Sequence, residues 1–542
     1  MKRKLICLLV AGAMSVSLFG CGGEATDSQQ TGGNEVVESS AEGGTQEGAS
    51  ATEAPVEPEK AAPNPIEIAK SEFGNPVAGF NAEGELTYGG DPSALVVGDT
   101  LYLYTGHDTA PTEAYVIPEY QCYSTKDMVN WSYEGVVLKA SDATWADKNA
   151  AWAGQVAKHY DAEAGKDMYY FYFCSWDKTD SGKQSIGVAI SESPTGPFVD
   201  LGQPLVKGSF TTDETSAWND IDPTVWIETD EKGEEHRYLC WGNSKLYMCE
   251  LNEDMISVKD YNGDGEIVFD EDIVSQMVPT SFTEAAWLYR RQDENGAYYG
   301  DYYLFYAYGW REQMAYATTD DLMNGRWYFG DIIMEPSVTS NTNHPAVVDF
   351  LGKTYFIYHN GSLPKGSGFR RVACVEELEF YEDGYVKYVQ ETATGVSGVK
   401  SILTALNGEV LTHEWFNNSG VDTSYPYKDM KLGSNLKNAK EEDNYWEIVQ
   451  GKADAEDVYY VSLESYNKPG LYITASEGAV GLTQDSTGKM ADIQTFKTVE
   501  GLAGEGVSFE SVAFEGMYLT LSGGSASLTD GTDVQACSFV IE

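Results

Sequence analysis

The sequence predicts an all-β protein, in which a five-bladed β-propeller is followed by a β-trefoil-like domain. Two repeats support this: a strand pattern that recurs five times between residues 64 and 399, and a shorter repeat of constant offset within residues 400–542. The first region shows no convincing run of helical periodicity. The 542 residues are 42% hydrophobic and 13% aromatic, which is enough for the cores of two or three domains.

Residues 1–21 have the features of a lipoprotein signal peptide. Residues 2–4 are basic, and the apolar run after them ends at Phe19. This run is too short and too early for an ordinary membrane span. Because Leu-Phe-Gly-Cys21 resembles a bacterial lipoprotein cleavage box, Cys21 is predicted to become the lipidated first residue at the extracellular face of a bacterial membrane. A plain secretory signal with a chance cysteine is the alternative.

Residues 22–63 consist mainly of Gly, Ser, Thr, Glu, Ala and Pro and contain almost no aromatic residues. Such a composition cannot bury enough apolar surface to fold. This segment is predicted to be a disordered acidic linker between the anchor and the folded domains.

The propeller prediction rests on one repeating unit. An aromatic strand opens each unit, and in several units a second strand leads into a polar turn that ends in an aromatic residue. The five aromatic strands cover residues 101–104, 169–172, 238–241, 302–306 and 355–358. Units at a spacing of roughly 50–70 residues are typical of propeller blades. A β-sandwich with long insertions is the competing interpretation.

The trefoil prediction rests on a gapless internal repeat. Val461–Ser465 and Gly470–Thr474 recur 46 residues later as Val507–Ser511 and Gly516–Thr520. The strand that begins at Trp446 resembles the close of an earlier, degraded copy. Three copies of this size indicate a β-trefoil.

Charge and cysteine content exclude several classes of function. The formal net charge of −50 would repel a phosphate backbone, so no nucleic-acid partner is expected, whereas a neutral polymer is compatible with it. Six cysteines lie beyond Cys21, without CxxC pairs or Cys/His zinc spacing, and they are expected to be buried thiols. A Cys240–Cys249 bond across a hairpin is the alternative for these two.

Three acids stand near strand starts in different repeats. Asp91 and Asp222 each precede a proline, and Glu284 precedes two alanines. Side chains from different blades converge at one end of a propeller axis, so these carboxylates are expected to meet. Hydrolysis of a glycosidic bond needs such groups, one as a proton donor and one on the opposite face of the sugar. Proline is expected to hold both aspartates extended; a plain Asp-Pro turn is the alternative.

From about Asn64 to Tyr388 the sequence resembles glycoside hydrolase family 43. The order Asp-Pro-Ser, Ile-Asp-Pro-Thr and Thr-Glu-Ala before an aromatic strand is that family's order of catalytic acids. Further matches are the segments 343–345, 358–361 and 368–371. The likeness is greatest to arabinofuranosidases and arabinoxylan-debranching members.

The resemblance implies a role for each acid. Asp91 would be the general base, Glu284 the general acid with a raised pKa, and Asp222 the residue that tunes and orients that acid. Inversion of configuration would place base and acid about 6.5–9.5 Å apart. Ala286 stands where related enzymes often have proline. Asp220, two residues before Asp222, would face the same side of a strand.

The resemblance also implies binding residues. Arg371 would reach the sugar, with Arg370 as the alternative. His344 would lie near the axis beside a calcium ion, unless it is a buried core histidine. The chemistry itself would need no cofactor.

A second calcium candidate comes from spacing alone. Asp260, Asn262, Asp264 and Glu271 take positions 1, 3, 5 and 12 of a calcium-binding loop, with glycine at position 6. The flanks do not resemble the helices of an EF-hand. An acidic hairpin turn is the alternative.

The C-terminal repeat resembles the arabinose-binding trefoil of carbohydrate-binding module family 42, most specifically at Leu502–Ser511. The module's sugar-contacting histidine is missing after Tyr472 and Tyr518, although Asp485 and Asp530 take plausible acidic positions. A purely structural trefoil is therefore the alternative to a binding domain.

Together these features predict an inverting hydrolase that releases terminal α-L-arabinofuranosyl residues from plant arabinoxylan or arabinan. A β-xylosidase or other pentosidase of the same family is the alternative. The rival from another class is a cell-surface polysaccharide-binding lipoprotein whose propeller has lost catalysis.

Overall fold

The computed structural model describes residues 62–180, 182–211, 215–230, 232–415, 430–453, 456–484 and 488–542. The predicted signal peptide, nearly all of the predicted linker, Cys21 and Asp485 lie outside these ranges. Strands make up most of the regular structure, with short 3-10 turns at Ala140–Asp142, Glu441–Asn444 and Gly488–Gln494. A membrane-spanning helix, judged by length and apolar character, does not occur among the described residues.

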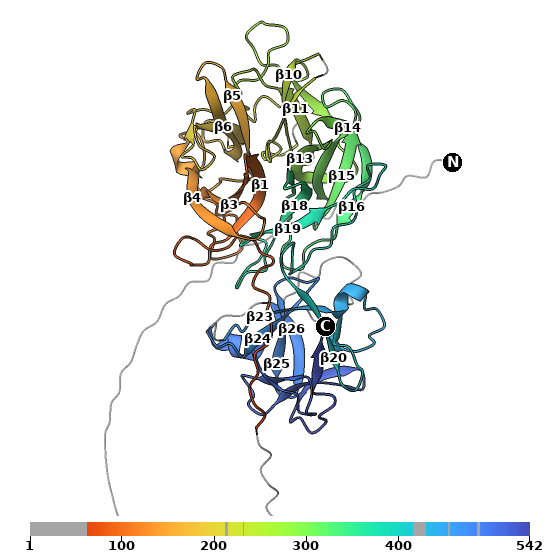
Figure 1. The fold of residues 1–542 in the computed structure, drawn as a ribbon. Coiled ribbons are helices and arrows are strands. Elements are labelled where there is room, and N and C mark those ends of the chain that lie inside the picture. The colour runs from red at the N-terminus through yellow and green to blue at the C-terminus, as the bar shows by residue number, and fades with distance from the viewer. Residues whose placement is uncertain are drawn as a thin grey trace, which may run out of the picture. The chain divides into compact units, whose positions relative to one another are not determined.

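Five antiparallel sheets, each running in chain order, form the N-terminal domain (Figure 1). The first two are β1 (Gly89–Val97), β2 (Thr100–His107), β3 (Glu119–Thr125) and β4 (Trp131–Lys139), then β5 (Gly154–Asp161), β6 (Lys166–Trp176), β7 (Gln184–Ser191) and β8 (Val199–Asp200). The next two are β9 (Thr224–Thr229), β10 (Glu235–Trp241), β11 (Leu246–Glu250) and β12 (Ile273–Gln276), then β13 (Phe282–Gln292), β14 (Tyr298–Tyr308), β15 (Gln313–Thr319) and β16 (Tyr328–Met334). The fifth is β17 (Ala346–Phe350), β18 (Lys353–Asn360) and β19 (Val372–Leu378).

These sheets are the blades of a five-bladed propeller, as the sequence predicts. The first strands contact one another in the order β1, β5, β9, β13 and β17, and β17 returns to β1 to close the ring. Each predicted aromatic strand is the second strand of its blade. Most of its aromatic side chains are buried because neighbouring blades pack against both faces of the sheet; Phe171, Phe305 and Phe356 are 0% exposed.

Twelve further strands form the C-terminal domain, which shows the predicted trefoil arrangement of three groups of four. The groups are β20 (Lys400–Ala405), β21 (Thr412–Trp415), β22 (Met430–Gly433) and β23 (Tyr445–Gln450); β24 (Tyr460–Ser465), β25 (Leu471–Ser476), β26 (Ala479–Gln484) and β27 (Phe496–Glu500); and β28 (Val507–Ser511), β29 (Tyr518–Ser522), β30 (Ser525–Thr529) and β31 (Phe539–Ile541). Each closing strand places one ring in a shared core, namely Trp446, Phe496 and Phe539.

The first residues of the predicted propeller belong to the other domain. Ile66 donates its backbone N–H to Thr498 at 3.0 Å, and Ser71 donates to Ile448 at 2.7 Å, so this segment runs along β27 and β23. The sequence places residues 64–71 in the propeller because their composition resembles that of the residues just after them. Backbone pairing, together with the packing of Ile68 on the trefoil core and the hydrogen bond from Lys70 to Gln450, assigns them to the trefoil, and such long-range contacts carry little sequence signal.

All six described cysteines are free and buried, as expected for core thiols. The Cys240–Cys249 pairing does not occur. Cys240 stands opposite Met248, and Cys249 stands opposite Leu239, one position along the hairpin. Because successive strand residues face opposite sides of a sheet, the two thiols lie in different cores.

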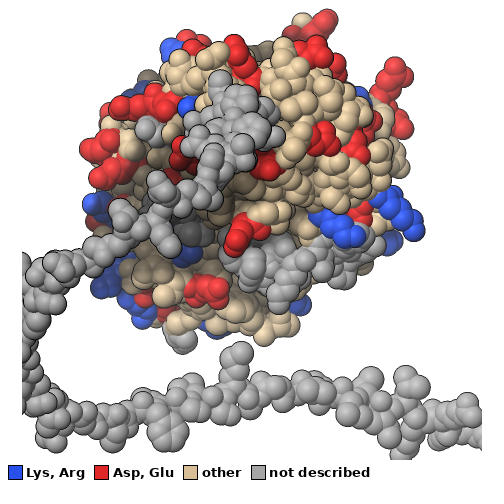
Figure 2. Space-filling model, turned by 90° about the horizontal axis from the view of Figure 1, so that it is seen from below, with Lys and Arg blue, Asp and Glu red and all other residues tan. Residues whose placement is uncertain are grey.

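Acidic residues dominate the surface charge. Figure 2 shows one face, on which Asp and Glu are spread among uncharged residues and Lys and Arg occur in smaller separate groups. Among the described residues that are visible on this face, Lys and Arg form no continuous stripe of the kind that tracks a phosphate backbone.

Candidate active site

A cavity of about 560 Å³ lies at one end of the propeller axis and receives residues from every blade. Asp91 comes from β1, Glu284 from β13, and Trp152, Asp222 and His344 precede β5, β9 and β17. The structure thus brings the three predicted acids, Arg371 and His344 into one pocket. The reason is the propeller itself, whose inner strands all start at the same end of the axis.

Of the two arginines that the sequence left open, Arg371 is the one that lines this pocket. It is 2% exposed; its Nη1 donates to Asp91 Oδ1 at 2.6 Å, and its Nε and Nη2 donate to the two oxygens of Asp108 at 2.9 and 3.0 Å. Arg370 instead donates to the carbonyl of Lys365. Gly90 makes room for the guanidinium, since a Cβ there would lie 2.1 Å from Arg371 Nε.

The backbone at both aspartates departs from the extended shape that the sequence predicts. Asp91 and Asp222 have φ values of 53° and 59°, in the left-handed region. Proline disfavours the right-handed helical region for the preceding residue, but tertiary contacts chose the left-handed one. Asp91, for example, donates its N–H to Nδ1 of His359 at 3.1 Å. Such a conformation costs about 1–3 kcal/mol and is typical of functional sites.

The environment of Asp91 favours its ionised form. Burial raises the pKa of Asp91, but the charge of Arg371, followed by those of His359 and His344 when they are protonated at low pH, outweighs burial and holds the pKa below its ordinary value of 3.8. A carboxylate that stays ionised and lines the cavity is suited to accept a proton from water.

The environment of Glu284 favours its protonated form. Burial raises the pKa of Glu284 above its ordinary value of 4.5, although contacts with Glu312 and Asn243 act in the opposite direction. Nδ2 of Asn243 donates to Glu284 Oε2 at 2.5 Å and fixes the carboxyl in place. A protonated carboxyl that faces the cavity is suited to protonate a leaving oxygen.

Asp222 lies between these two acids and holds the backbone beside Glu284. Its Oδ2 accepts the N–H of Ala285 at 2.7 Å, and its pKa is raised by burial and then by the charges of Glu284 and Asp91. Asp220, by contrast, accepts hydrogen bonds from Trp241 Nε1 at 2.7 Å and Thr211 Oγ1 at 2.8 Å. Asp222 can therefore orient the acid. Asp220 instead links Thr211, which precedes the third blade, to Trp241 in β10.

These charge states predict a bell-shaped dependence of kcat/KM on pH. Activity should fall on the acid side as Asp91 gains a proton, at a pH below the ordinary 3.8 of aspartate. It should fall on the alkaline side as Glu284 loses its proton, above the ordinary 4.5 of glutamate. Initial rates measured from pH 3 to 9 at low substrate concentration would check both limbs. An alkaline limb below that of free glutamate would contradict the assignment of Glu284 as the acid.

His344 is buried beside Asp91 in the cavity lining, with its Nδ1 4.0 Å from Oδ1 of that residue. Burial lowers the pKa of His344 to about 4 and that of His359 to about 3, so both rings are neutral near pH 7. A neutral imidazole can ligate a metal. Around His344, however, the described residues place no group of three His, Cys, Asp or Glu ligand atoms. Any calcium there would need ligands of another kind, and it stays a prediction.

The second calcium candidate folds as an acidic turn. Asp260 accepts the backbone N–H groups of Gly263 and Gly265 at 2.6 and 2.7 Å, and Asn262 points its amide nitrogen at Glu271, 3.0 Å from Oε2. Asp264 likewise accepts a backbone N–H at 2.8 Å. These bends lie in the long connection between β11 and β12, and calcium binding there stays a prediction. Within the described ranges, the three-ligand group that does gather is Asp230, Glu234 and His236 on another hairpin.

Sequence reasoning missed four residues that complete the pocket. Asp108 anchors Arg371, His359 receives the Asp91 N–H, Asn243 binds Glu284, and Glu312 contacts Glu284 while accepting the Asn343 N–H at 2.6 Å. Asp108 and Asn243 each follow the second strand of a blade. The sequence argument considered only acids near the start of a blade's first strand, so it did not reach these two residues. The Glu312 carboxyl is 2% exposed, and only the folded chain shows that it lies beside the acid.

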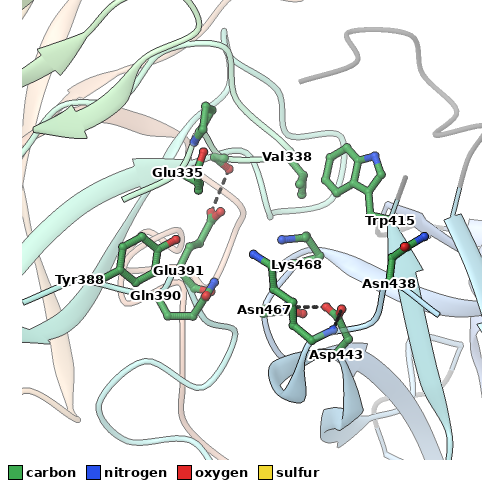
Figure 3. Close-up of a pocket in the computed structure, with 13 residues that line it drawn as sticks. Glu335, Val338, Tyr388, Gln390, Glu391, Trp415, Asn438, Asp443, Asn467 and Lys468 are labelled. Atoms are coloured by element: carbon green, nitrogen blue, oxygen red, sulfur yellow. Dashed lines mark hydrogen bonds between the residues drawn. The ribbon is translucent and has the colours of Figure 1, made fainter. Parts of the chain in front are cut away.

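A second pocket, of about 310 Å³, is lined by residues of both domains (Figure 3). Glu391 and Tyr388 come from the propeller part, and Trp415, Asp443 and Lys468 from the trefoil. Burial lowers the pKa of Lys468, while the charges of Glu391 and Asp443 oppose that shift. The mixture of an ammonium group, carboxylates, amides and an indole is suited to hydroxyl-rich ligands.

The first trefoil copy contains a histidine, His413, at the position where the sequence comparison found none in the other two copies. Thr412, Thr474 and Thr520 each donate their hydroxyl to the carbonyl two residues earlier, so they are equivalent positions. His413 then matches Ala475 and Leu521. It is 0% exposed; its Nε2 contacts Ser465 Oγ at 2.8 Å, and its Nδ1 lies 3.7 Å from Asp443. His413 thus lies beside Asp443, which is one of the acidic residues that line the second pocket.

Comparison with known proteins supports a carbohydrate-active chain. Residues 86–386 match the model of glycosyl hydrolases family 43, and residues 416–535 match the alpha-L-arabinofuranosidase B domain. A xylosidase/arabinosidase of Bacteroides ovatus is 29% identical over 55% of this chain and 94% of its own length. An arabinoxylan arabinofuranohydrolase of Paenibacillus polymyxa is 26% identical over 68% of this chain and 60% of its own. The crystal structure of an alpha-L-arabinofuranosidase from Clostridium thermocellum is 29% identical, covers 57% of this chain and 95% of its own, and has a TM-score of 0.44.

Proposed function

The chain belongs to glycosyl hydrolase family 43 and hydrolyses O-glycosyl bonds, and on this premise we propose that it releases terminal α-L-arabinofuranosyl residues from arabinoxylan or arabinan with inversion of configuration. The carrying observation is that Asp91 and Glu284 line one cavity in surroundings that act on them in opposite directions. The surroundings lower the pKa of Asp91 and raise that of Glu284, which is the direction that single-step displacement by water requires of its base and its acid.

The proposed reaction uses only residues of this chain. Asp91 takes a proton from a water molecule whose oxygen attacks the anomeric carbon. As the bond from that carbon to the glycosidic oxygen breaks, Glu284 gives its proton to the leaving oxygen. Arg371 keeps Asp91 ionised, and Asp222 keeps Glu284 in place through Ala285. Proton transfer of this kind contributes about 10²–10⁴-fold to the rate.

Arabinose is proposed rather than xylose because the C-terminal residues match an arabinofuranosidase B domain and because one relative is an arabinoxylan arabinofuranohydrolase. The relative from Bacteroides ovatus is a xylosidase/arabinosidase, so the β-xylosidase stays the alternative. The test is a panel of arabinoxylan, arabinan, methyl α-L-arabinofuranoside and methyl β-D-xylopyranoside, with free sugar identified by chromatography. Release of arabinose with the inverted anomer first seen by proton NMR supports the proposal. Release of xylose alone would favour the β-xylosidase, and retained binding without release would favour the inactive binding lipoprotein.

A second function is supported by the pocket of Figure 3. We propose that the trefoil side of this pocket helps to hold the polysaccharide, because Lys468 and Trp415 lie there together, with Nζ 5.6 Å from the ring centroid. Replacing Lys468 with Met should weaken retardation of the enzyme in arabinoxylan-containing gels without changing hydrolysis of a methyl glycoside. Lys452→Met is the matched control, because Lys452 also covers a ring, that of Tyr472, at 4.2 Å. Equal retardation of both variants and wild type would argue for a purely structural trefoil.

The proposed lipid anchor at Cys21 would keep these activities at the extracellular face of the membrane. The enzyme would then meet plant cell-wall polysaccharide outside the cell. It would cut the polymer there, because the polymer is too large to enter.

A further inference from the structure

Two exposed tryptophans stand at the mouth of the catalytic cavity. Trp218 is 49% exposed and Trp310 is 73% exposed, and both line the cavity that contains Asp91 and Glu284. Exposed apolar side chains that stand singly are common, but these two indoles share the mouth of one cavity, and no other tryptophan in the described part of the chain is as exposed. Neither indole contributes to the core clusters of the blades.

Both tryptophans are joined to the acid side of the cavity. Trp218 precedes Asn219, whose Nδ2 donates to the carbonyl of Asn243 at 2.5 Å, and Asn243 in turn donates to Glu284. Trp310 lies two residues before Glu312, which contacts Glu284. The neighbouring Gly309 is held against the Glu284 strand, because its N–H donates to Ser281 at 2.9 Å and its carbonyl accepts from Thr283 at 3.2 Å.

The acid side is where the leaving group must lie. In an inverting hydrolase the acid protonates the oxygen that departs, and the base activates water on the opposite face of the sugar. Groups that flank Glu284 at the cavity mouth therefore meet the part of the substrate beyond the scissile bond. Groups around Asp91 meet the terminal sugar.

Trp218 is supported from behind by other rings. Its ring centroid lies 6.4 Å from that of Trp176, which lies 5.8 Å from Trp152, which lies 6.3 Å from Tyr115. Tyr115 in turn covers the Arg371 guanidinium at 5.3 Å. This row of ring contacts connects Trp218 with Trp152 and Tyr115, which also line the cavity, and it restricts the outer indole, so less conformational entropy is lost when a ligand stacks on it.

We propose that Trp218 and Trp310 form a platform for the main chain of the polysaccharide from which the terminal sugar is removed. Sugar rings present a face of C–H groups that stacks on an indole, and a chain with a net charge of −50 tolerates a neutral polymer there. This inference rests on the proposed function and adds to it. The terminal sugar enters the cavity, while the polymer lies across the two indoles and determines which substrates are cut efficiently.

Trp218→Ala, Trp310→Ala and the double variant test the platform on two substrates. On arabinoxylan we expect kcat/KM to fall about tenfold for each single variant and further for the double variant. On methyl α-L-arabinofuranoside, whose leaving group has no ring to stack, we expect a change of less than about threefold. Tyr328→Ala is the matched control, because Tyr328 is 60% exposed on the same blade but does not line the cavity; this variant should match wild type on both substrates.

The outcomes separate the two proposals. Wild-type enzyme that releases no arabinose from either substrate contradicts the proposed function. Wild-type enzyme that acts on both, with variants that lose nothing on the polymer or lose equally on both substrates, contradicts the platform. Thermal unfolding of each variant checks folding, and if Trp218→Ala does not fold, Trp310→Ala decides alone, since Trp310 is the more exposed of the two and belongs to none of the core clusters of the blades.

Discussion

Replacing Asp91 with Asn is expected to lower kcat on arabinoxylan by about 10³-fold while the protein remains folded. An amide cannot take the proton from the attacking water, so the step loses its base. The fold should survive because Arg371 keeps its two hydrogen bonds to Asp108 when its bond to residue 91 weakens. The measurement is steady-state kinetics with quantified arabinose, together with the midpoint of thermal unfolding.

Asp220→Asn is the matched control for this substitution. It makes the same chemical change at a buried aspartate of the same region, but Asp220 binds Trp241 and Thr211 instead of a reacting atom. We expect its kcat to stay within about threefold of wild type, with any loss appearing in stability. An Asp91→Asn enzyme that kept a tenth of its activity would show that another group acts as the base.

The second large effect is expected for Glu284→Gln, and it should depend on the leaving group. With arabinoxylan, kcat should fall by about 10³-fold, because the sugar oxygen that leaves needs a proton. With a 2,4-dinitrophenyl arabinofuranoside the loss should be less than about tenfold, because that phenolate leaves without one. The alkaline limb of the pH profile should also disappear, since the group that titrates there is gone. Rates on both substrates across pH supply the test.

Glu376→Gln controls for the loss of a buried carboxyl as such. Burial raises the pKa of Glu376 to about 8, and this residue accepts hydrogen bonds from Asn75 and Thr392 away from the catalytic cavity. Its substitution should leave the leaving-group dependence and the alkaline limb unchanged. A Glu284→Gln enzyme that lost the two substrates equally would point to a role in binding rather than in proton donation.

The sequence was informative about the fold because each blade repeats a local pattern. The aromatic strands at 169–172 and 302–306 are each sandwiched between neighbouring blades, so their composition directly reflects their burial. Backbone conformation was predicted less well. Asp91 and Asp222 were expected to be extended before proline, yet both adopt positive φ, because contacts from other blades and the bulged inner strand decide between the conformations that proline allows.

The amino-acid sequence alone specifies the architecture, the order of the three acids and their convergence, since strand starts in a propeller meet at one end of the axis. What each acid can do depends instead on the folded chain. Asp91 is held ionised by Arg371, which lies 280 residues away, and Glu284 is held by Asn243, 41 residues away. The choice of Arg371 over Arg370 depends on space beside Gly90. Protonation states depend on burial and on charges brought together by folding, and neither can be read from neighbouring positions in the chain.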